Sequence, residues 1–180
     1  SQQCLMRIVG LKPLTAKLDW RKRMVICGID PGLTGGITFM SDRHLVCKPV
    51  PIETYVINKK KRKFLDAVSI CDLFQEYSPS TIFIERQQSM PSQGVVSTFR
   101  TGFGYGLYIG LIVGSGNKFV EVRPQTWKKD LGVTSDKDQA RMKATELMPD
   151  ASECWSKKSQ DGIAESALIA YWGMNYYSLN

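Results

Sequence analysis

The sequence predicts one α/β domain in which a mixed, five-stranded sheet is flanked by helices. Segments of strand and helix character follow one another in the order strand, strand, strand, helix, strand, helix, strand, helix, helix, which is typical of a mixed α/β fold. The 180 residues are 43% hydrophobic and 23% charged, a composition that fits one compact domain with a sizeable core. We expect this domain over residues 24–180, after a basic N-terminal extension over residues 1–23.

The expected strands are short apolar runs rich in β-branched residues and bounded by turn residues. They cover 24–29, 36–40, 45–52, 81–85 and 118–122. Asp30-Pro31-Gly32 predicts a tight turn after the first strand, and Pro49 and Pro51 place the end of the third at an edge or in a loop. Apolar spacing predicts helices over 64–77, 95–113, 125–131, 135–148 and 162–176. Residues 1–23 have no clean period, so a basic arm, an expression remnant and a trimmed targeting segment all remain open.

The overall composition narrows the function classes. No apolar run approaches the length of a membrane span, and the chain does not start with a secretory pattern, so we expect a soluble protein. Five cysteines without a C-x-x-C pair fit a reducing compartment. The net charge of +7 favours a polyanionic partner. The one histidine, His44, is expected in a solvated turn, which disfavours histidine-dependent zinc sites and Ser-His-Asp triads.

Four carboxylates carry the most chemical information. Asp30 and Glu85 each end an apolar run, and a charge at the end of a buried strand needs a partner. Asp161 and Glu165 lie one turn apart on one face of the last expected helix. If these acids meet, cations must offset their repulsion, and an all-oxygen cluster suits hard ions such as Mg²⁺ or Mn²⁺. The competing interpretation makes them helix caps or ion-pair partners.

Five short motifs occur in an order that resembles the RuvC family of Holliday-junction resolvases, which has a ribonuclease H-like fold. They are Ile29-Asp30-Pro31-Gly32, Ile84-Glu85, the glycine-rich 101–106, Pro124-Gln125-Thr126-Trp127-Lys128 and Asp161-Gly162-Ile163-Ala164-Glu165. The resemblance covers about residues 24–176 and is nearest to the phage and chloroplast branches. The last motif departs from the family pattern. The family usually has Asp three residues after the third acid of the site, whereas in this chain Glu165 follows Asp161 by four residues.

The resemblance implies a two-metal site with Mg²⁺, or Mn²⁺ in its place, held by Asp30, Glu85, Asp161 and Glu165. Asp30 would bridge both ions, Glu85 would hold one, and the two acids of the last helix would complete the shells. Lys128, also a catalytic candidate, and Lys137 match lysines that the family places near scissile phosphates. Arg141 and Lys143 are expected to extend that DNA-binding surface, although a lone surface lysine is more often simply solvated.

The loop after Glu85 and the glycine-rich helix are the remaining DNA-binding candidates. Family members carry an aromatic wedge in this loop, but 86–93 has none, so Met90 is the expected wedge and Gln88 a contact to base edges. Arg100 is a further DNA-binding candidate. In the helix, Gly106, Gly110 and Gly114 share one face, which predicts either close packing inside the monomer or a homodimer interface. The basic run 59–63 is expected in a solvated helix approach or loop, with phosphate contact as the alternative.

The leading hypothesis is an Mg²⁺-dependent endonuclease that acts as a homodimer and nicks opposed strands of a four-way DNA junction. One alternative is a ribonuclease H-like nuclease that acts on hybrids or other branched DNA. A second is a junction-binding module that does not cleave. An actin-like or sugar-kinase phosphate site is disfavoured because such proteins need two copies of this core. A DNA-containing, reducing compartment is expected, either cytoplasm or an organelle.

Overall fold

A mixed β-sheet forms the centre of the computed structural model, which describes residues 4–7, 24–134 and 137–176. Its strand order is β1-β4-β3-β2-β7-β8. The strands are β1 (Cys4–Arg7), β2 (Ile26–Asp30), β3 (Gly36–Met40), β4 (His44–Pro49), β7 (Thr81–Glu85) and β8 (Phe119–Val122). The pairs β1–β4, β4–β3 and β3–β2 are antiparallel, whereas β2–β7 and β7–β8 are parallel. The predicted α/β class with a mixed sheet is therefore confirmed.

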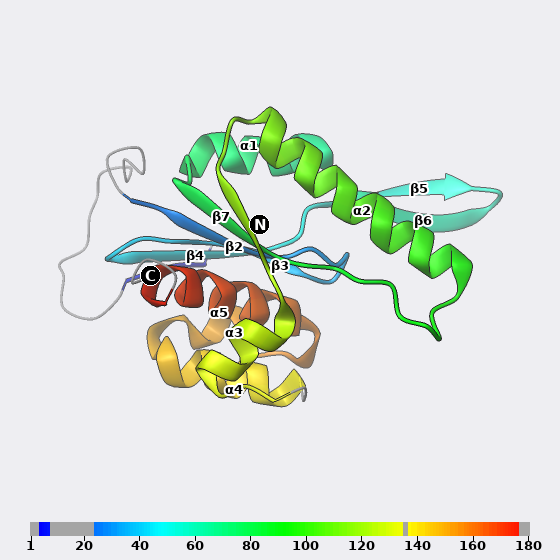
Figure 1. Ribbon diagram of the computed structural model, residues 1–180. Helices are drawn as coiled ribbons and strands as arrows, with labels where there is room; N and C mark the ends of the chain where they lie inside the picture. The colour runs from blue at the N-terminus through cyan, green and yellow to red at the C-terminus, as the bar shows by residue number, and fades with distance from the viewer. Residues whose placement is uncertain (1–3, 8–23, 135–136, 177–180) are drawn as a thin grey trace.

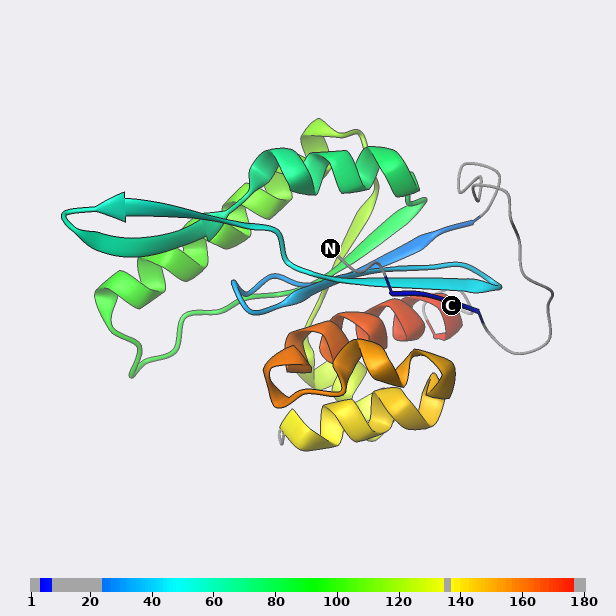
Figure 2. The ribbon, with the colours of Figure 1, turned by 180° about the vertical axis from the view of Figure 1, so that it is seen from behind.

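Helices cover both faces of this sheet (Figures 1 and 2). On one face lie α1 (Ala67–Tyr77) and α2 (Val95–Gly114). On the other lies α5 (Asp161–Asn175), with α3 (Pro124–Leu131) and α4 (Lys137–Leu147) outside it. Each face has its own apolar core, one around Ile29, Phe39 and Tyr108 and the other around Trp127, Trp155 and Leu168. The sheet thus separates two hydrophobic layers.

Helix α5 packs tightly against β2 and β3 because glycines face it. A Cβ atom added at Gly28 would lie 2.3 Å from the Ser166 carbonyl oxygen, and one added at Gly36 would lie 2.6 Å from Ser166 Oγ. The hydroxyls of Thr38 and Ser166 also lie 2.8 Å apart in a buried hydrogen bond. This close approach fixes the position of α5 along the strands, and with it the side chains that α5 carries toward the strand ends.

Three features differ from the expectations based on sequence. Residues 52–65, expected as strand end and helix approach, form a separate hairpin of β5 (Ile52–Ile57) and β6 (Lys60–Leu65), because β-branched and aromatic residues in β5 favour a strand. Four residues of the expected extension, β1, pair with β4 as a sixth strand, and the rest of 1–23 lies outside the described residues. Two short 3-10 helices, η2 (Pro149–Trp155) and η3 (Lys158–Gln160), connect α4 to α5.

The expectation that His44 is a solvated turn residue is wrong. The β3–β4 turn is tight, with Ser41 N donating to the His44 carbonyl oxygen at 2.9 Å, so His44 already belongs to β4 and is 6% exposed. It still does not join the carboxylates, because the β3–β4 turn lies beside the start of β2, at the end of the strand away from Asp30. No helix in the described ranges combines the length and apolarity that crossing a membrane requires.

Candidate active site

Asp30 and Glu85 lie side by side at the edge of the sheet. They end the neighbouring parallel strands β2 and β7, whose register pairs Ile29 with Ile84. Carboxyl ends of parallel strands meet at one edge, so two acids far apart in sequence become neighbours there. Both are largely enclosed, and Glu85 is 9% exposed.

The start of α5 reaches the same edge through glycines. Gly162 forms an isolated parallel bridge with Gly35, directly after the β2 turn. A Cβ atom added at Gly162 would lie 2.7 Å from Asp30 Oδ2 and 2.5 Å from the Thr34 carbonyl oxygen. Only glycine fits here, so the motif Asp161-Gly162 has a packing reason. The approach brings Glu165, one turn into α5, toward the two strand-terminal acids.

The three acids Asp30, Glu85 and Glu165 influence one another electrostatically. The pKa of Asp30 is raised to about 7, mainly by burial and then by the charges of Glu165 and Glu85, while the Gly32 amide and Lys128 act in the opposite direction. Burial likewise raises the pKa of Glu85, and the charge of Glu165 adds to this rise. These acids therefore form one cluster that resists becoming fully ionised.

Helix α3 supplies two side chains that contact the cluster. Trp127, fully buried, donates from Nε1 to Glu85 Oε2 at 2.9 Å, and this bond lowers the pKa of Glu85. Lys128 Nζ lies 2.8 Å from Glu165 Oε1 and 5.0 Å from the centroid of the Trp127 ring. Both partners of this ion pair are mostly shielded, with side chains 23% and 17% exposed. Pro124 starts α3 immediately after β8, which aims the helix back at the carboxylates.

The donor set fits a hard divalent cation. It contains only carboxylate oxygens, and their mutual repulsion and desolvation are the penalties that a bound cation would offset. Over the described ranges, no three His, Cys, Asp or Glu side chains already stand in the geometry of a closed metal site.

The fold is similar to that of solved RuvC structures. The Thermus thermophilus RuvC structure matches with a TM-score of 0.55 at 13% identity, over 84% of this chain and 95% of that one. T. thermophilus RuvC in complex with Holliday junction substrate matches over the same shares, with a TM-score of 0.54 at 12% identity. The chain has the RuvC fold. The predicted ribonuclease H-like architecture and the resemblance to RuvC-like resolvases are thereby confirmed.

A sequence relative supports the same resemblance. This chain is 27% identical over 94 residues to the chloroplastic Holliday junction resolvase MOC1 of Chlamydomonas reinhardtii. The match covers 51% of this chain but only 11% of that longer protein. No protein-family model matches the chain.

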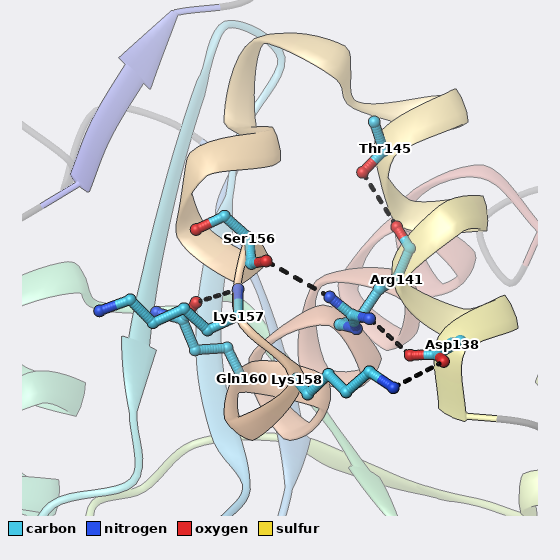
Figure 3. A network of polar contacts seen from close by, with 7 residues as sticks. All are labelled: Asp138, Arg141, Thr145, Ser156, Lys157, Lys158 and Gln160. Atoms are coloured by element: carbon cyan, nitrogen blue, oxygen red, sulfur yellow. Dashed lines mark hydrogen bonds and ion pairs between the residues drawn. The ribbon is translucent and has the colours of Figure 1, made fainter.

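Two predicted basic residues of α4, Arg141 and Lys143, form ion pairs with acids outside the carboxylate cluster. Arg141, with 18% of its side chain exposed, pairs with Asp138 and donates to the Ser156 carbonyl oxygen at 3.4 Å, so it ties α4 to the end of η2 (Figure 3). Lys158 also pairs with Asp138, at 3.6 Å. Lys143 pairs with Glu146 on the same helix. Lys137 is the first residue of α4, and its side chain lies outside the described part.

The predicted contacts of the β7–α2 segment are all on the surface. Gln88 and Arg100 are exposed, and the side chain of Met90 is 63% exposed. The amide group of Gln93 bonds Ser97 and Thr101, which holds this loop against the first turns of α2. These residues are accessible to a ligand beside the β7 end of the site.

Sequence reasoning missed two side chains near the cluster. Trp127 belongs to the motif Pro124-Gln125-Thr126-Trp127-Lys128, but only Lys128 of that motif was predicted to have a functional role. Tyr108 on α2 is fully buried, and its hydroxyl has no hydrogen-bond partner among the described residues. Burial raises the pKa of Tyr108, and the charge of Asp30 raises it further, which places the phenol within the field of the site. The sequence did contain a signal for Tyr108, because helical spacing puts it on the face opposite Gly106 and Gly110.

Proposed function

We propose that this chain is a structure-selective endonuclease that resolves Holliday junctions, cutting opposed strands by phosphodiester hydrolysis. One observation carries the proposal: Asp30, Glu85 and Glu165 converge from β2, β7 and α5 of a RuvC-like fold into one electrostatically coupled cluster. The relative MOC1 bears the name of a Holliday junction resolvase, and one RuvC structure is described with such a substrate. We assign residues 24–180 to the nuclease domain, in which recombination and repair intermediates would be cut.

The cofactor in this proposal is Mg²⁺, with Mn²⁺ as a substitute. When bound, two such ions would supply Lewis-acid activation of a water and charge stabilisation for phosphodiester hydrolysis. Asp30, Glu85, Asp161 and Glu165 would hold them. The hydrogen bond from Trp127 fixes the orientation of the Glu85 carboxylate before any ion arrives, and ligand-orienting bonds of this kind raise metal affinity.

Lys128 has a different part in the proposed reaction. Its ammonium faces Glu165 at 2.8 Å, so its positive charge lies beside the cluster and can meet an incoming phosphate oxygen. The same ion pair holds the Glu165 side chain in place while the site awaits its ligands. Lys128 thus both orients an acid and attracts the backbone of the substrate.

A homodimer would match the twofold symmetry of a four-way junction. Helix α2 has an open glycine face: Cβ atoms added at Gly102, Gly106, Gly110 or Gly114 would meet nothing within 4 Å. Val95, Phe99, Phe103 and Val113 are exposed on the same helix, between 59% and 86%. The expectation that these glycines serve packing inside the monomer therefore lacks a contact, and a second copy of α2 is the occupant we propose.

A cleavage assay tests the function directly. Wild type and Asp30→Asn are incubated with an end-labelled synthetic junction, a linear duplex of the same sequence and an RNA/DNA hybrid, each with Mg²⁺ and with EDTA. We expect symmetric nicks in the junction only, by wild type only, and only with Mg²⁺. Junction binding without cutting would identify a binding module, and preferential cutting of the hybrid would identify a ribonuclease. Equal cutting by Asp30→Asn would refute the carboxylate site.

The compartment is also part of the proposal. Cys27, Cys47 and Cys71 are free thiols, and burial raises the pKa of Cys27 well above its usual value. Free thiols fit a reducing, DNA-containing compartment. The chloroplast relative points to an organelle as one such place, beside the cytoplasm of a bacterium or an infected cell.

A further inference from the structure

The β5–β6 hairpin is a two-stranded ribbon that stands apart from the central sheet. It forms a sheet of its own, and Figures 1 and 2 show it projecting past the N-terminal part of α2. Most of its side chains are exposed, including Tyr55 at 51%, Val56 at 70% and Ile57 at 47%. A two-stranded hairpin without a covering layer is marginally stable in water, so we expect a binding partner to cover this one.

The charge of the hairpin identifies the chemistry of that partner. Residues 59–63 are five consecutive cations, Lys59, Lys60, Lys61, Arg62 and Lys63. Glu53 is the one acid in residues 52–65, so the ribbon has a net charge of +4, five cations less one acid. Glu53 accepts a hydrogen bond from the Tyr55 hydroxyl, and no carboxylate of the described residues forms an ion pair with the five cations. Five uncompensated neighbours repel one another unless a polyanion lies against them.

The register distributes these cations over both faces of the ribbon. Tyr55 pairs with Arg62 and Ile57 with Lys60 on one face. On the other face, Thr54 pairs with Lys63 and Val56 with Lys61. Paired residues point to the same side of a two-stranded sheet, so each face presents two cations beside apolar or hydroxyl groups. A ribbon that lay flat on a single surface would need cations on one face only.

We propose that the β5–β6 hairpin enters a groove of a duplex arm of the junction, so that the cations of its two faces contact the phosphates of opposite groove walls. The proposal rests on the proposed function for the identity of the DNA. The major groove of B-DNA admits a two-stranded ribbon. A strand of six residues spans about 20 Å, or roughly six base pairs along the arm. The hairpin would therefore hold an arm away from the carboxylates that cut.

Two matched double variants and a control test this placement. Lys60→Gln/Arg62→Gln removes the cations of one face, and Lys61→Gln/Lys63→Gln those of the other. The control, Arg43→Gln/Lys118→Gln, removes two exposed cations at the far end of the sheet, where β3 ends and β8 begins. All three are made in the Asp30→Asn background, which leaves the junction uncut, and binding is measured across a salt series and by hydroxyl-radical footprinting.

Each hairpin variant is expected to bind the junction at least about tenfold more weakly than the background, because each removes two phosphate contacts. The slope of log affinity against log salt should fall by about 1.8, at about 0.9 per lost contact. Protection of one stretch of a duplex arm should disappear, while protection at the crossover stays. The control should change neither quantity. Circular dichroism and thermal unfolding of each variant check that the fold is retained.

Four outcomes would overturn the inference. They are unchanged binding in both hairpin variants, loss confined to one face, equal loss in the control, and a change in sedimentation without a change in footprint, which would assign the hairpin to protein contact. The proposed function is judged separately, by cleavage with wild type. A hairpin effect on DNA in a protein that never cuts a junction would keep this inference and refute the nuclease proposal.

Discussion

The indole Nε1 of Trp127 lies 2.9 Å from Glu85 Oε2, which makes a buried residue of α3 the orienting partner of an acid at the end of β7. This partner is rigid, because only two rotatable bonds join an indole ring to the backbone and the Trp127 ring is fully enclosed.

Replacing Trp127 with Phe should lower the affinity for Mg²⁺ without loss of the fold. The variant leaves Glu85 without its donor, and removal of such orienting bonds typically lowers metal affinity about 10- to 100-fold. A Mg²⁺ titration of junction cleavage measures this as a shift of the midpoint to higher concentration. Trp172→Phe is the matched control, since its Nε1 donates to Asp130 at 2.7 Å outside the cluster. An equal shift in both variants would show a general packing effect instead.

Lys128→Gln should reduce the cleavage rate by about 10²-fold, the usual effect of removing one preorganised electrostatic contact to a reacting phosphate. It also leaves Glu165 without its ion-pair partner, which adds to repulsion inside the cluster. Lys129→Gln removes the exposed neighbouring lysine and should leave the single-turnover rate nearly unchanged. Comparable rates for the two variants would remove Lys128 from the reaction.

The stability of the metal-free protein should depend on Asp30 and pH. Folding raises the pKa of Asp30 from 3.8 to about 7, so the folded state holds this proton more tightly than the unfolded state does. The resulting stabilisation is complete below about pH 4 and is lost as the pH rises to about 7, at about 1.4 kcal/mol per pKa unit. In EDTA, Asp30→Asn should therefore gain stability relative to wild type across this window, by a few kcal/mol. Urea unfolding at several pH values measures the difference, and a constant difference would contradict the prediction.

Leucine at the open glycines of α2 should produce a monomer. Gly106→Leu/Gly110→Leu adds bulk where the monomer has no contacting atoms, so a second helix can no longer approach. Analytical ultracentrifugation should show half the mass, with thermal unfolding unchanged or improved because glycine is a poor helix former. Gln75→Leu/Glu76→Leu also places two leucines on an exposed helix surface, that of α1, and should leave the mass unchanged. A dimeric leucine variant would exclude this face.

Gly28→Ala should destabilise the protein by about 1–3 kcal/mol or prevent folding, because the new methyl group would overlap the backbone of α5 at Ser166 and Ala170. Gly104→Ala places its methyl group 3.6 Å from Leu65 Cδ1, an ordinary contact, and should stabilise α2 by about 0.5–1 kcal/mol. Chemical unfolding of both variants gives the comparison. Equal effects would mean that α5 is free to move away from β2.

The positions of Asp30 and Glu85 could be predicted from the sequence, because each follows an apolar run that indicates a strand and each marks where that strand ends. It did not predict the β5–β6 hairpin, since the lysines of β6 mask strand periodicity and only the β-branched residues of β5 indicated it. His44 was predicted to be exposed because the polar residues Ser41, Asp42 and Arg43 before it indicate a turn. It is buried because β4 begins at His44 itself. Contacts such as Trp127–Glu85 join residues 42 positions apart and follow from packing that no local pattern encodes.

The seating of α5 on Gly28, Gly36 and Gly162 has a consequence for synthesis on the ribosome. Asp30 and Glu85 emerge early, but the acids Asp161 and Glu165 follow more than 70 residues after Glu85, on a helix that packs against β2 and β3. A nascent chain that ends before α5 therefore carries two of the three clustered acids and none of the helix that completes the cluster. Under the proposed function, a partly made chain near DNA would be harmless, and cutting would begin only after this last helix has docked.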